Sequence, residues 1–579
     1  MKLIRRSTFN RIKTRLARLY GSWRADELAD RLYMLIGRYG TAPKKTGSRP
    51  VFSENDAVLI TYGDMVQRPG QRPLATLKDF CDRRLAGAIN TVHILPFCPS
   101  SSDGGFSVID YREVDPALGK WRDIDWIGRD YRLMVDLVLN HCSSKSRWFR
   151  DYLGGIAPEK NYFIEADPGA DLSAVVRPRP WPLLKKVETA LGTRWVWTTF
   201  SADQIDLDWS SPDVLFEFLD ILLLYISHGA RVVRLDAVGF LWKEPGTSCM
   251  HLPQTHEMVK LLHDFLLTAA PEVALITETN VPHPENISYF GDGDEAHMVY
   301  QFTLAPMLLY TLLHEDSTYL QCWLRRFAEP PENGTFFNFT ASHDGIGLRP
   351  LEGMFNNEEI DWLVDETKKR GGLVNTRSMP DGSERPYELN ITYIDALSDP
   401  DDEDLGLRRF LCSQAVVMCL KGVPAFYFHS LVGTRNWREG AEKGENRDIN
   451  RRRWQAGELD ALLDNPESPH ARVLAKLVAM LRTRRGRKAF HPEGGQEILE
   501  TEGYVLGVLR ISPDGEKRVL CWFNFTPDPL PVPEGMTREK LGDGPWRDIL
   551  ADGEAAEPGR DSGKEWTIEP YGTVWLRTQ

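Results

Sequence analysis

Short apolar runs alternate with longer helix-like segments through the middle of the chain. Eight runs have the character of buried strands, and the segments between them carry apolar residues at helical spacing. A strand that is apolar throughout is typical of a parallel sheet covered on both faces. The expected strands are residues 57–62, 91–97, 132–139, 232–238, 274–279, 298–302, 335–340 and 423–428. Eight such units closing on themselves predict a (β/α)8 TIM barrel of the α/β class.

An open, doubly wound sheet is the alternative arrangement of alternating strands and helices. The dinucleotide-binding form of that fold carries a GxGxxG turn after its first strand, and this sequence has none there. The barrel is therefore the favoured fold.

The pattern changes at both ends of the barrel region. Residues 1–50 predict an N-terminal helical extension whose linker, 42–50, is rich in Pro, Gly and Lys. Residues 51–494 are the expected catalytic barrel. Its connections at about 142–206 and 345–410 are too long for simple loops and predict inserted subdomains. In residues 495–579, short apolar strands separated by Pro, Gly and Asp turns predict a C-terminal antiparallel β domain.

Composition and charge narrow the range of partners. The net charge of −13 argues against a generally basic nucleic-acid surface. The basic N-terminal segment lacks the apolar stretch of a signal peptide, and polar residues interrupt the most apolar segments, so no membrane partner is expected. The eight cysteines include no CxxC pair. We expect a soluble, reduced, cytoplasmic protein, a monomer or homodimer, with neither a nucleic-acid nor a membrane partner.

Acidic residues stand at the ends of three predicted strands, where a barrel places its active site. The fourth strand carries Asp236 near its end, Glu278 is at the end of the fifth, and Asp344 follows the seventh. Burying so much charge costs several kcal/mol unless the groups are paired or have chemical work. Arg234 stands two residues before Asp236, His343 is next to Asp344, and His141 is at the end of the third strand.

Such a set suits glycoside chemistry. Two carboxyls about 5–5.5 Å apart allow a double displacement, in which one attacks the anomeric carbon and the other protonates the leaving oxygen. Arg234, two residues before Asp236 on the same strand face, would hold down the pKa of that carboxyl. The apolar strand before Glu278 would keep that group protonated by desolvation. Asp344 would stabilise the cationic transition state.

Four ordered motifs carry a family resemblance. DLVLNH (136–141), RVVRLDAV (231–238), ITET (276–279) and ASHD (341–344) resemble those of glycoside hydrolase family 13, the α-amylase family. The resemblance implies Asp236 as nucleophile, Glu278 as acid/base and Asp344 as transition-state stabiliser. It also implies that His141, Arg234 and His343 line a glucose subsite.

A finer resemblance points to the sucrose phosphorylase group of that family. It rests on segments such as ILPFCPSSSDGGFSVIDY (94–111) and NRDINRRRW (446–454). It implies that Asp103 and Arg447 bind the far hydroxyls of a single glucose and that Phe106 packs on its ring. Taken without the resemblance, Asp103 is equally an ordinary turn residue and Arg447 a solvated charge.

The acceptor side departs from that group. Phe240 and Asn280 replace the usual Tyr and His, and Tyr387-Glu388, preceded by Arg385, replaces a common Tyr-Gln. Residues 276–291 look more like the branch acting on glucosylglycerate or glucosylglycerol. These five residues are the candidates for binding acceptor and phosphate. Arg385 would pair with a glycerate carboxylate, whereas Glu388 would accept hydrogen bonds from polyol hydroxyls, so the two favour different acceptors.

The expected activity is that of a retaining phosphorylase, which moves glucosyl from a small α-glucoside to phosphate and gives α-glucose 1-phosphate. The alternatives are a sucrose or sucrose 6′-phosphate phosphorylase, a hydrolase or transglucosidase, and a non-catalytic amylase-like binding protein. We expect no cofactor besides phosphate as co-substrate, and no metal. Many amylase relatives bind calcium near the position of Asn140. A second stretch, GDGDEAH (291–297), has the acidic composition of a metal loop but lacks the ligand spacing of an EF-hand, so we expect a turn there.

Overall fold

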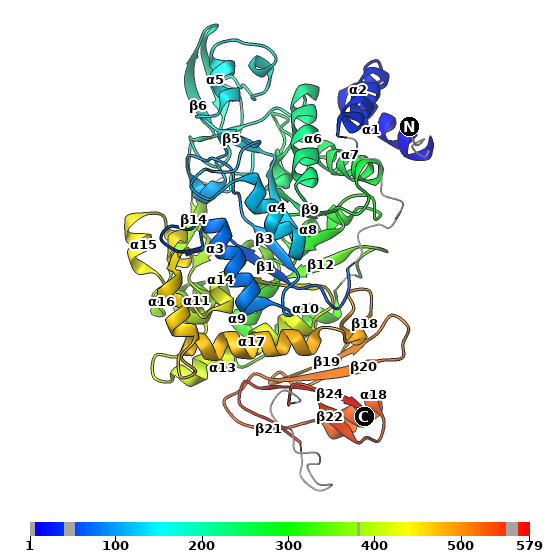
Figure 1. Cartoon of the computed structure of the whole chain (residues 1–579), viewed down its shortest axis with the longest axis vertical. Coiled ribbons are helices and arrows are strands. Elements are labelled where there is room, and N and C mark those ends of the chain that lie inside the picture. The colour runs from blue at the N-terminus through cyan, green and yellow to red at the C-terminus, as the bar shows by residue number, and fades with distance from the viewer. Residues whose placement is uncertain are drawn as a thin grey trace.

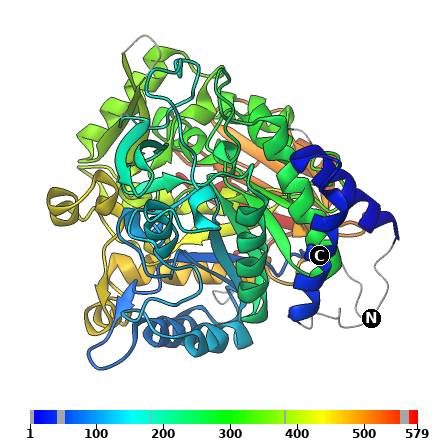
Figure 2. The same cartoon turned by 90° about the horizontal axis from the view of Figure 1, so that it is seen from above.

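The barrel predicted from the apolar runs is confirmed. The computed structural model describes residues 6–39, 52–179, 181–327, 329–378, 383–551 and 566–578; the predicted linker of residues 42–50 lies outside them. Within these ranges eight parallel strands form a closed barrel in the order β1-β16-β12-β11-β10-β9-β4-β3 (Figures 1 and 2). They are β1 (Val58–Thr61), β3 (Thr91–Ile94), β4 (Arg132–Val138), β9 (Ala230–Asp236), β10 (Ala274–Thr277), β11 (Met298–Tyr300), β12 (Thr335–Asn338) and β16 (Val423–Tyr427).

Helices cover the outside of the barrel, which is why its strands are apolar on both faces. Every residue of β1, β3, β10 and β12 is buried. The longer covering helices are α4 (Trp121–Asp130), α6 (Pro212–Ser227), α7 (Pro253–Ala269), α9 (Leu304–His314), α13 (Glu403–Cys419) and α17 (Pro469–Arg484); α3 (Pro73–Phe80), α8 (His283–Ile287) and α10 (Thr318–Arg325) are shorter. No helix in the described ranges has the length and apolar character that crossing a membrane requires.

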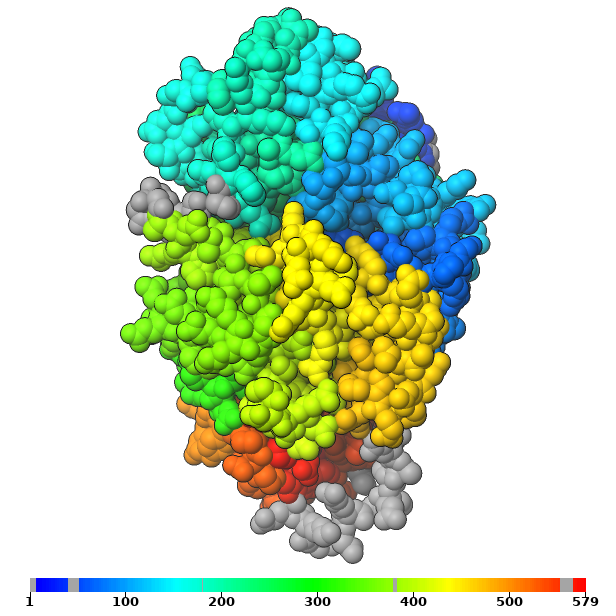
Figure 3. Space-filling model, turned by 90° about the vertical axis from the view of Figure 1, so that its left-hand side faces the viewer, coloured from blue at the N-terminus to red at the C-terminus, as the bar shows by residue number. Residues whose placement is uncertain are grey.

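Two long connections carry extra structure at the carboxyl ends of the strands. The connection from β4 to β9 contains β5 (His141–Ser143), α5 (Arg147–Leu153), β6 (Leu184–Thr189), β7 (Gly192–Trp197) and β8 (Gln204–Asp206). The connection from β12 to β16 contains β13 (Ile346–Gly347), α11 (Asn357–Lys369), β14 (Leu373–Ser378), β15 (Glu384–Asn390) and α12 (Tyr393–Ala396). Figure 3 shows both on one face of the molecule, the first in cyan to teal and the second in yellow-green.

A small antiparallel sheet follows the barrel, as predicted (lower end of Figure 1). Its order is β18 (Gly495–Ile498), β19 (Val505–Ile511), β20 (Arg518–Asn524), β24 (Thr573–Thr578) and β22 (Trp546–Asp548). The alternation of a strand gives it two apolar faces: Leu520 and Trp522 belong to a separate small core, whereas Cys521 and Phe523 join the main one. The remaining elements are β2 (Val66–Gln67), α14 (Phe428–Leu431), α15 (Arg438–Lys443), β17 (Trp454–Gln455), α16 (Ala456–Leu463), β21 (Leu530–Pro531), α18 (Glu534–Leu541) and β23 (Thr567–Ile568).

Two N-terminal helices, α1 (Arg6–Tyr20) and α2 (Ala25–Arg38), pack against the outer side of the barrel (Figures 1 and 2, blue). α1 lies on α7 and α2 on α6. Arg15 joins α1 to α7 through an ion pair of 2.6 Å with the buried carboxylate of Asp264, and Arg11 approaches the same carboxylate to 2.8 Å. The helix pair is thus attached to α7, which connects strands β9 and β10.

Candidate active site

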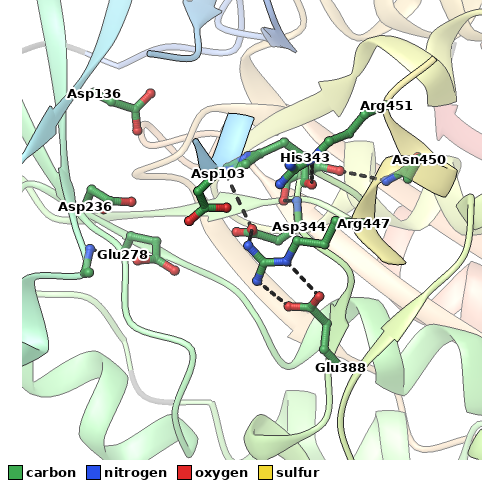
Figure 4. A network of polar contacts seen from close by, with 12 residues as sticks. Asp103, Asp136, Asp236, Glu278, His343, Asp344, Glu388, Arg447, Asn450 and Arg451 are labelled. Atoms are coloured by element: carbon green, nitrogen blue, oxygen red, sulfur yellow. Dashed lines mark hydrogen bonds and ion pairs between the residues drawn. The ribbon is translucent and has the colours of Figure 1, made fainter. Parts of the chain in front are cut away.

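The three acidic candidates meet at the carboxyl end of the barrel (Figure 4). Asp236 is the last residue of β9, Glu278 follows β10 directly, and Asp344 lies in the loop after β12. Their side chains face one another because the ends of parallel strands lie at one rim. The structure therefore brings together the carboxylates that the strand pattern singled out.

Arg234 connects the first two carboxylates. The buried guanidinium lies 2.7 Å from Asp236 Oδ1 and 3.8 Å from Glu278 Oε2, and it also pairs with Asp136 on β4. The backbone N–H of Ala237 donates to Glu278 Oε2 at 3.0 Å. Ala237 has a left-handed backbone, with φ of 49°, which is a strained conformation for a residue with a Cβ. The turn after Asp236 thus aims a donor at Glu278.

Asp236 and Glu278 are set up to share one proton. Burial raises the pKa of Asp236, against the effect of Arg234, and the nearby Glu278 charge raises that pKa further. Burial also raises the pKa of Glu278, and Asp344 adds to it. Two buried carboxyls this strongly linked do not ionise together. Since Arg234 is closer to Asp236, the negative charge is favoured on Asp236 and the proton on Glu278.

Asp344 is held as a carboxylate. Burial alone would raise its pKa, but Arg447 and His343 lower it below the usual range. Arg447 Nη1 lies 2.6 Å and His343 Nε2 3.6 Å from Asp344 Oδ1. Burial lowers the pKa of His343 to about 3, so its imidazole is neutral at pH 7. The ring of Phe106 stacks on it at 4.7 Å between centroids.

Glu388 is paired with Arg447 in the structure. Its side chain is 1% exposed, and both oxygens accept hydrogen bonds from Arg447, at 2.9 Å from Nε and 2.5 Å from Nη2. Arg447 therefore lies between the carboxylates of Asp344 and Glu388 (Figure 4). Both oxygens of the Glu388 carboxylate are thus engaged by Arg447.

Asp103 and His141 come from different segments and are joined by Gln204. The Gln204 amide donates to Asp103 Oδ2 at 3.0 Å, and its nitrogen is 3.1 Å from His141 Nε2. Asp103 has φ of 52°, again left-handed. Gln204, on β8 of the first insertion, had no motif that could have marked it in the sequence.

A buried lysine occupies the region where the family resemblance suggested calcium. Lys243 Nζ is 2.7 Å from Asp206 Oδ2 and also donates to the side-chain oxygen of Asn140. In the described part of the chain, no cluster of three or more His, Cys, Asp or Glu side chains is arranged to hold a metal ion. An ammonium group supplies positive charge here.

A small cavity opens beside Glu278, with a volume of about 50 Å³, which is room for roughly three to five water molecules. Its lining includes Phe240, Met250, Glu278, Asn280, Arg349 and Tyr387. Three of the five acceptor candidates, Phe240, Asn280 and Tyr387, are therefore together. Among the described residues, the lining does not include Arg385 or Glu388.

A β-bulge separates Tyr387 from Arg385. On β14, Asn375 pairs with Glu388 and the next residue, Thr376, pairs with Pro386, so Tyr387 is the extra residue. A bulge re-aims side chains and breaks the alternation of the strand. Tyr387 lines the cavity, whereas Arg385 is exposed. Arg349 lines the cavity instead, and it was missed because it stands outside the recognised motif, five residues after Asp344.

Two glycines of the loop after Asp344 allow this close packing. A Cβ on Gly345 would lie 2.5 Å from Glu388 Cγ, and a Cβ on Gly347 would lie 2.4 Å from the Asn280 amide. Real Cβ atoms do not approach so closely. The sequence SHDGIG thus lets Glu388 and Asn280 reach their positions.

Comparison with known proteins identifies the family of the chain. The sequence profile of the alpha amylase catalytic domain matches residues 87–323. A glucosylglycerate phosphorylase of Spirochaeta thermophila is 49% identical, with 89% of each chain covered, and one of Escherichia coli is 41% identical, with 95% of this chain and 97% of the relative covered. The crystal structure of sucrose 6F-phosphate phosphorylase from Thermoanaerobacter thermosaccharolyticum superposes with a TM-score of 0.71 at 26% identity, covering 82% of this chain and 94% of that one. The chain belongs to the α-amylase family, glycoside hydrolase family 13, and within it to the group of glycoside phosphorylases.

Proposed function

We propose that this protein is a retaining phosphorylase of α-glucosylglycerate, with Asp236 as nucleophile, Glu278 as acid/base and Asp344 as stabilising carboxylate. The observation that carries the proposal is the pair of Asp236 and Glu278, linked by Arg234, with a cavity beside Glu278 that holds the acceptor candidates Phe240, Asn280 and Tyr387. The names of the relatives at 41% and 49% identity support glycerate as the acceptor.

The reaction takes place in two displacements at the anomeric carbon. First, Asp236 attacks that carbon while Glu278 gives its proton to the glycosidic oxygen, which leaves as the hydroxyl of glycerate. Then a phosphate oxygen attacks the same carbon, the ester bond to Asp236 breaks, and Glu278 accepts a proton from the entering phosphate. Two inversions restore the α-configuration, so the product is α-glucose 1-phosphate.

The glucose unit is held by the groups around Asp344 in this proposal. Asp103 and Arg447 bind the hydroxyls far from the reacting carbon, and Phe106 contacts the ring. Arg234, His141 and His343 contact the hydroxyls nearer to it. The neutral imidazole of His343 suits this role because it can donate to and accept from hydroxyls without adding charge.

A phosphorolysis assay tests the function. Wild-type protein with glucosylglycerate and inorganic phosphate should release α-glucose 1-phosphate, faster than with sucrose, sucrose 6′-phosphate or glucosylglycerol. Asp236→Asn should lower turnover by orders of magnitude, whereas Asp365→Asn, on the exposed side of α11, should not change it. Release of free glucose independent of phosphate would identify a hydrolase, and β-glucose 1-phosphate would exclude the double displacement.

We further propose that the protein works in the cytoplasm. All eight cysteines are free, which is typical of a reducing compartment. A monomer or homodimer stays the predicted oligomeric state.

A further inference from the structure

The second half-reaction presents an electrostatic problem. Once Glu278 has protonated the leaving group it is a carboxylate, and phosphate, a dianion near neutral pH, has to approach it. Asp236 is neutral at that stage because it is esterified to glucose. Like charges at close range disfavour such an encounter, so the cavity needs a cation that is not already neutralised.

The two arginines nearest the reacting carboxylates are already engaged. Arg234 is shared among Asp136, Asp236 and Glu278. Arg447 lies between Asp344 and Glu388 and makes its contacts at 2.5–2.9 Å. Neither guanidinium can turn to an incoming anion without breaking a buried ion pair, which is strongly destabilising because it leaves an uncompensated charge.

Arg349 is different. It lines the cavity, its side chain is 12% exposed, and its buried Nε has no hydrogen-bond partner in the described structure. Its Nη1 contacts the Met250 sulfur at 3.9 Å. The nearest carboxylate, Glu352, is 4.0 Å from Arg349 Nε but 2.6 Å from Arg377 Nη2. A buried charged donor with so little compensation is costly unless a ligand completes it.

A second polar group on the cavity wall also lacks a partner. The side-chain oxygen of Asn280 is buried without a hydrogen bond, and its amide is held over Gly347. An Asn oxygen accepts, so it can bind a hydroxyl beside the anion. The wall thus offers a cation for an anionic group and an acceptor for a hydroxyl, as a hydroxy acid requires.

We propose that Arg349 is the anion-binding residue of the acceptor site, which pairs first with the carboxylate of the departing three-carbon hydroxy acid and then with the entering phosphate. The inference rests on the proposed function and refines it. The small volume of the cavity means that the two anions occupy it in turn. Arg349 favours an acid over a polyol as acceptor, because a neutral acceptor would leave the guanidinium with Glu352, 4.0 Å away and shared with Arg377, as its nearest counter-charge.

The neighbouring arginines add to the positive electrostatic potential around Arg349 but do not line the cavity. Arg377 pairs with Glu352, and its pKa is lowered first by burial and then by the charges of Arg349 and Arg385. Glu352 is thus one carboxylate among the three cations Arg349, Arg377 and Arg385, and the net charge of this group stays positive. This arrangement keeps Arg349 available, since the carboxylate beside it is committed to Arg377.

The test uses α-glucosyl fluoride as donor in place of α-glucose 1-phosphate, so that the donor itself releases no phosphate. Transfer to glycerate, phosphate and glycerol is measured for the wild type, Arg349→Gln and Arg349→Lys. Arg349→Gln should lower kcat/KM for both anions relative to glycerol by about 10- to 100-fold, the value of a charge-assisted hydrogen bond. Arg349→Lys should recover part of the loss, because it keeps the charge but not the planar fork. Arg472→Gln, on the exposed side of α17 and paired with Asp404, is the arginine control.

Each outcome discriminates. Equal loss for the two anions and glycerol in Arg349→Gln would make Arg349 structural and overturn the inference. A loss of anion preference in Arg385→Gln as large as in Arg349→Gln would move the anion site to β15 and also overturn it. If wild-type protein transfers glucosyl to neither glycerate nor phosphate, the proposed function itself fails. If the wild type prefers anionic acceptors and Arg349→Gln keeps the same preference, only the role of Arg349 is refuted.

Discussion

Replacing Glu388 by Gln separates two roles for this residue. The side chain is 1% exposed and accepts two hydrogen bonds from Arg447, at 2.9 and 2.5 Å. Breaking a buried ion pair costs about 3–5 kcal/mol. Gln keeps one acceptor, worth about 1 kcal/mol, and turns an N–H toward the guanidinium. We therefore expect Glu388→Gln to lower the free energy of unfolding by about 2–4 kcal/mol.

Urea unfolding followed by tryptophan fluorescence measures this loss. The set comprises Glu388→Gln, Arg447→Gln and the double variant, with Glu384→Gln as control because Glu384 is exposed on the same strand. The control should stay within about 0.5 kcal/mol of the wild type. If the two side chains stabilise each other, the double variant should lose at least 1 kcal/mol less than the sum of the single variants.

Two results would refute this reasoning. Additive losses in the double variant would mean that Glu388 and Arg447 act independently. A Glu388→Gln variant with the wild-type urea midpoint but a new preference among glycerol, glycerate and fructose would return Glu388 to the acceptor site, as the sequence alone suggested.

Three further predictions follow from the site. Glu278→Gln should slow phosphorolysis of glucosylglycerate by orders of magnitude but spare formation of the glucosyl-enzyme from α-glucosyl fluoride, whose leaving group needs no proton; equal loss with both donors would exclude Glu278 as the acid. In the wild type, kcat/KM for glucosylglycerate should fall as pH rises through the pKa of Glu278, which burial raises. Lys243→Ala should destabilise the protein by about 3–5 kcal/mol, because it leaves the buried Asp206 without its 2.7 Å partner, and wild-type activity should withstand EDTA; a neutral variant in urea unfolding would contradict the pairing. Gly347→Ala should displace Asn280, whose amide lies 2.4 Å from the new Cβ, and raise KM for the acceptor with little change in thermal stability; an unchanged KM would show that Asn280 does not contact the acceptor.

The barrel and its carboxylates could be predicted because each depends on local sequence. A fully buried strand must be apolar along its whole length, and a polar residue at its end must be at the rim. Those two rules are sufficient for the eight strands and for Asp236, Glu278 and Asp344. The domain boundaries and the roles of the site residues stay predictions.

The acceptor side could not be predicted in the same way because it depends on non-local geometry. Alternation along β15 would place Arg385 and Tyr387 on one face, and the bulge at Tyr387 separates them. Glu388 meets Arg447 across 59 residues of chain, a pairing that no short motif encodes. Arg349 acquires its position from the loop that Gly345 and Gly347 allow to fold closely against its neighbours.

The attachment of α1 to α7 has a consequence for the order of folding. The partners Arg15 and Asp264 are 249 residues apart, so during synthesis α1 waits about 10–50 s for its docking surface at ~5–20 residues per second. With 15 and 14 residues, α1 and α2 are marginal as isolated helices. Their apolar sides, Leu16 and Leu28 among them, must stay exposed until strands β9 and β10 flank a completed α7. During synthesis the helix pair therefore cannot dock before the βα unit that carries Asp236 has emerged, and until then α6 and α7 lack this outer cover.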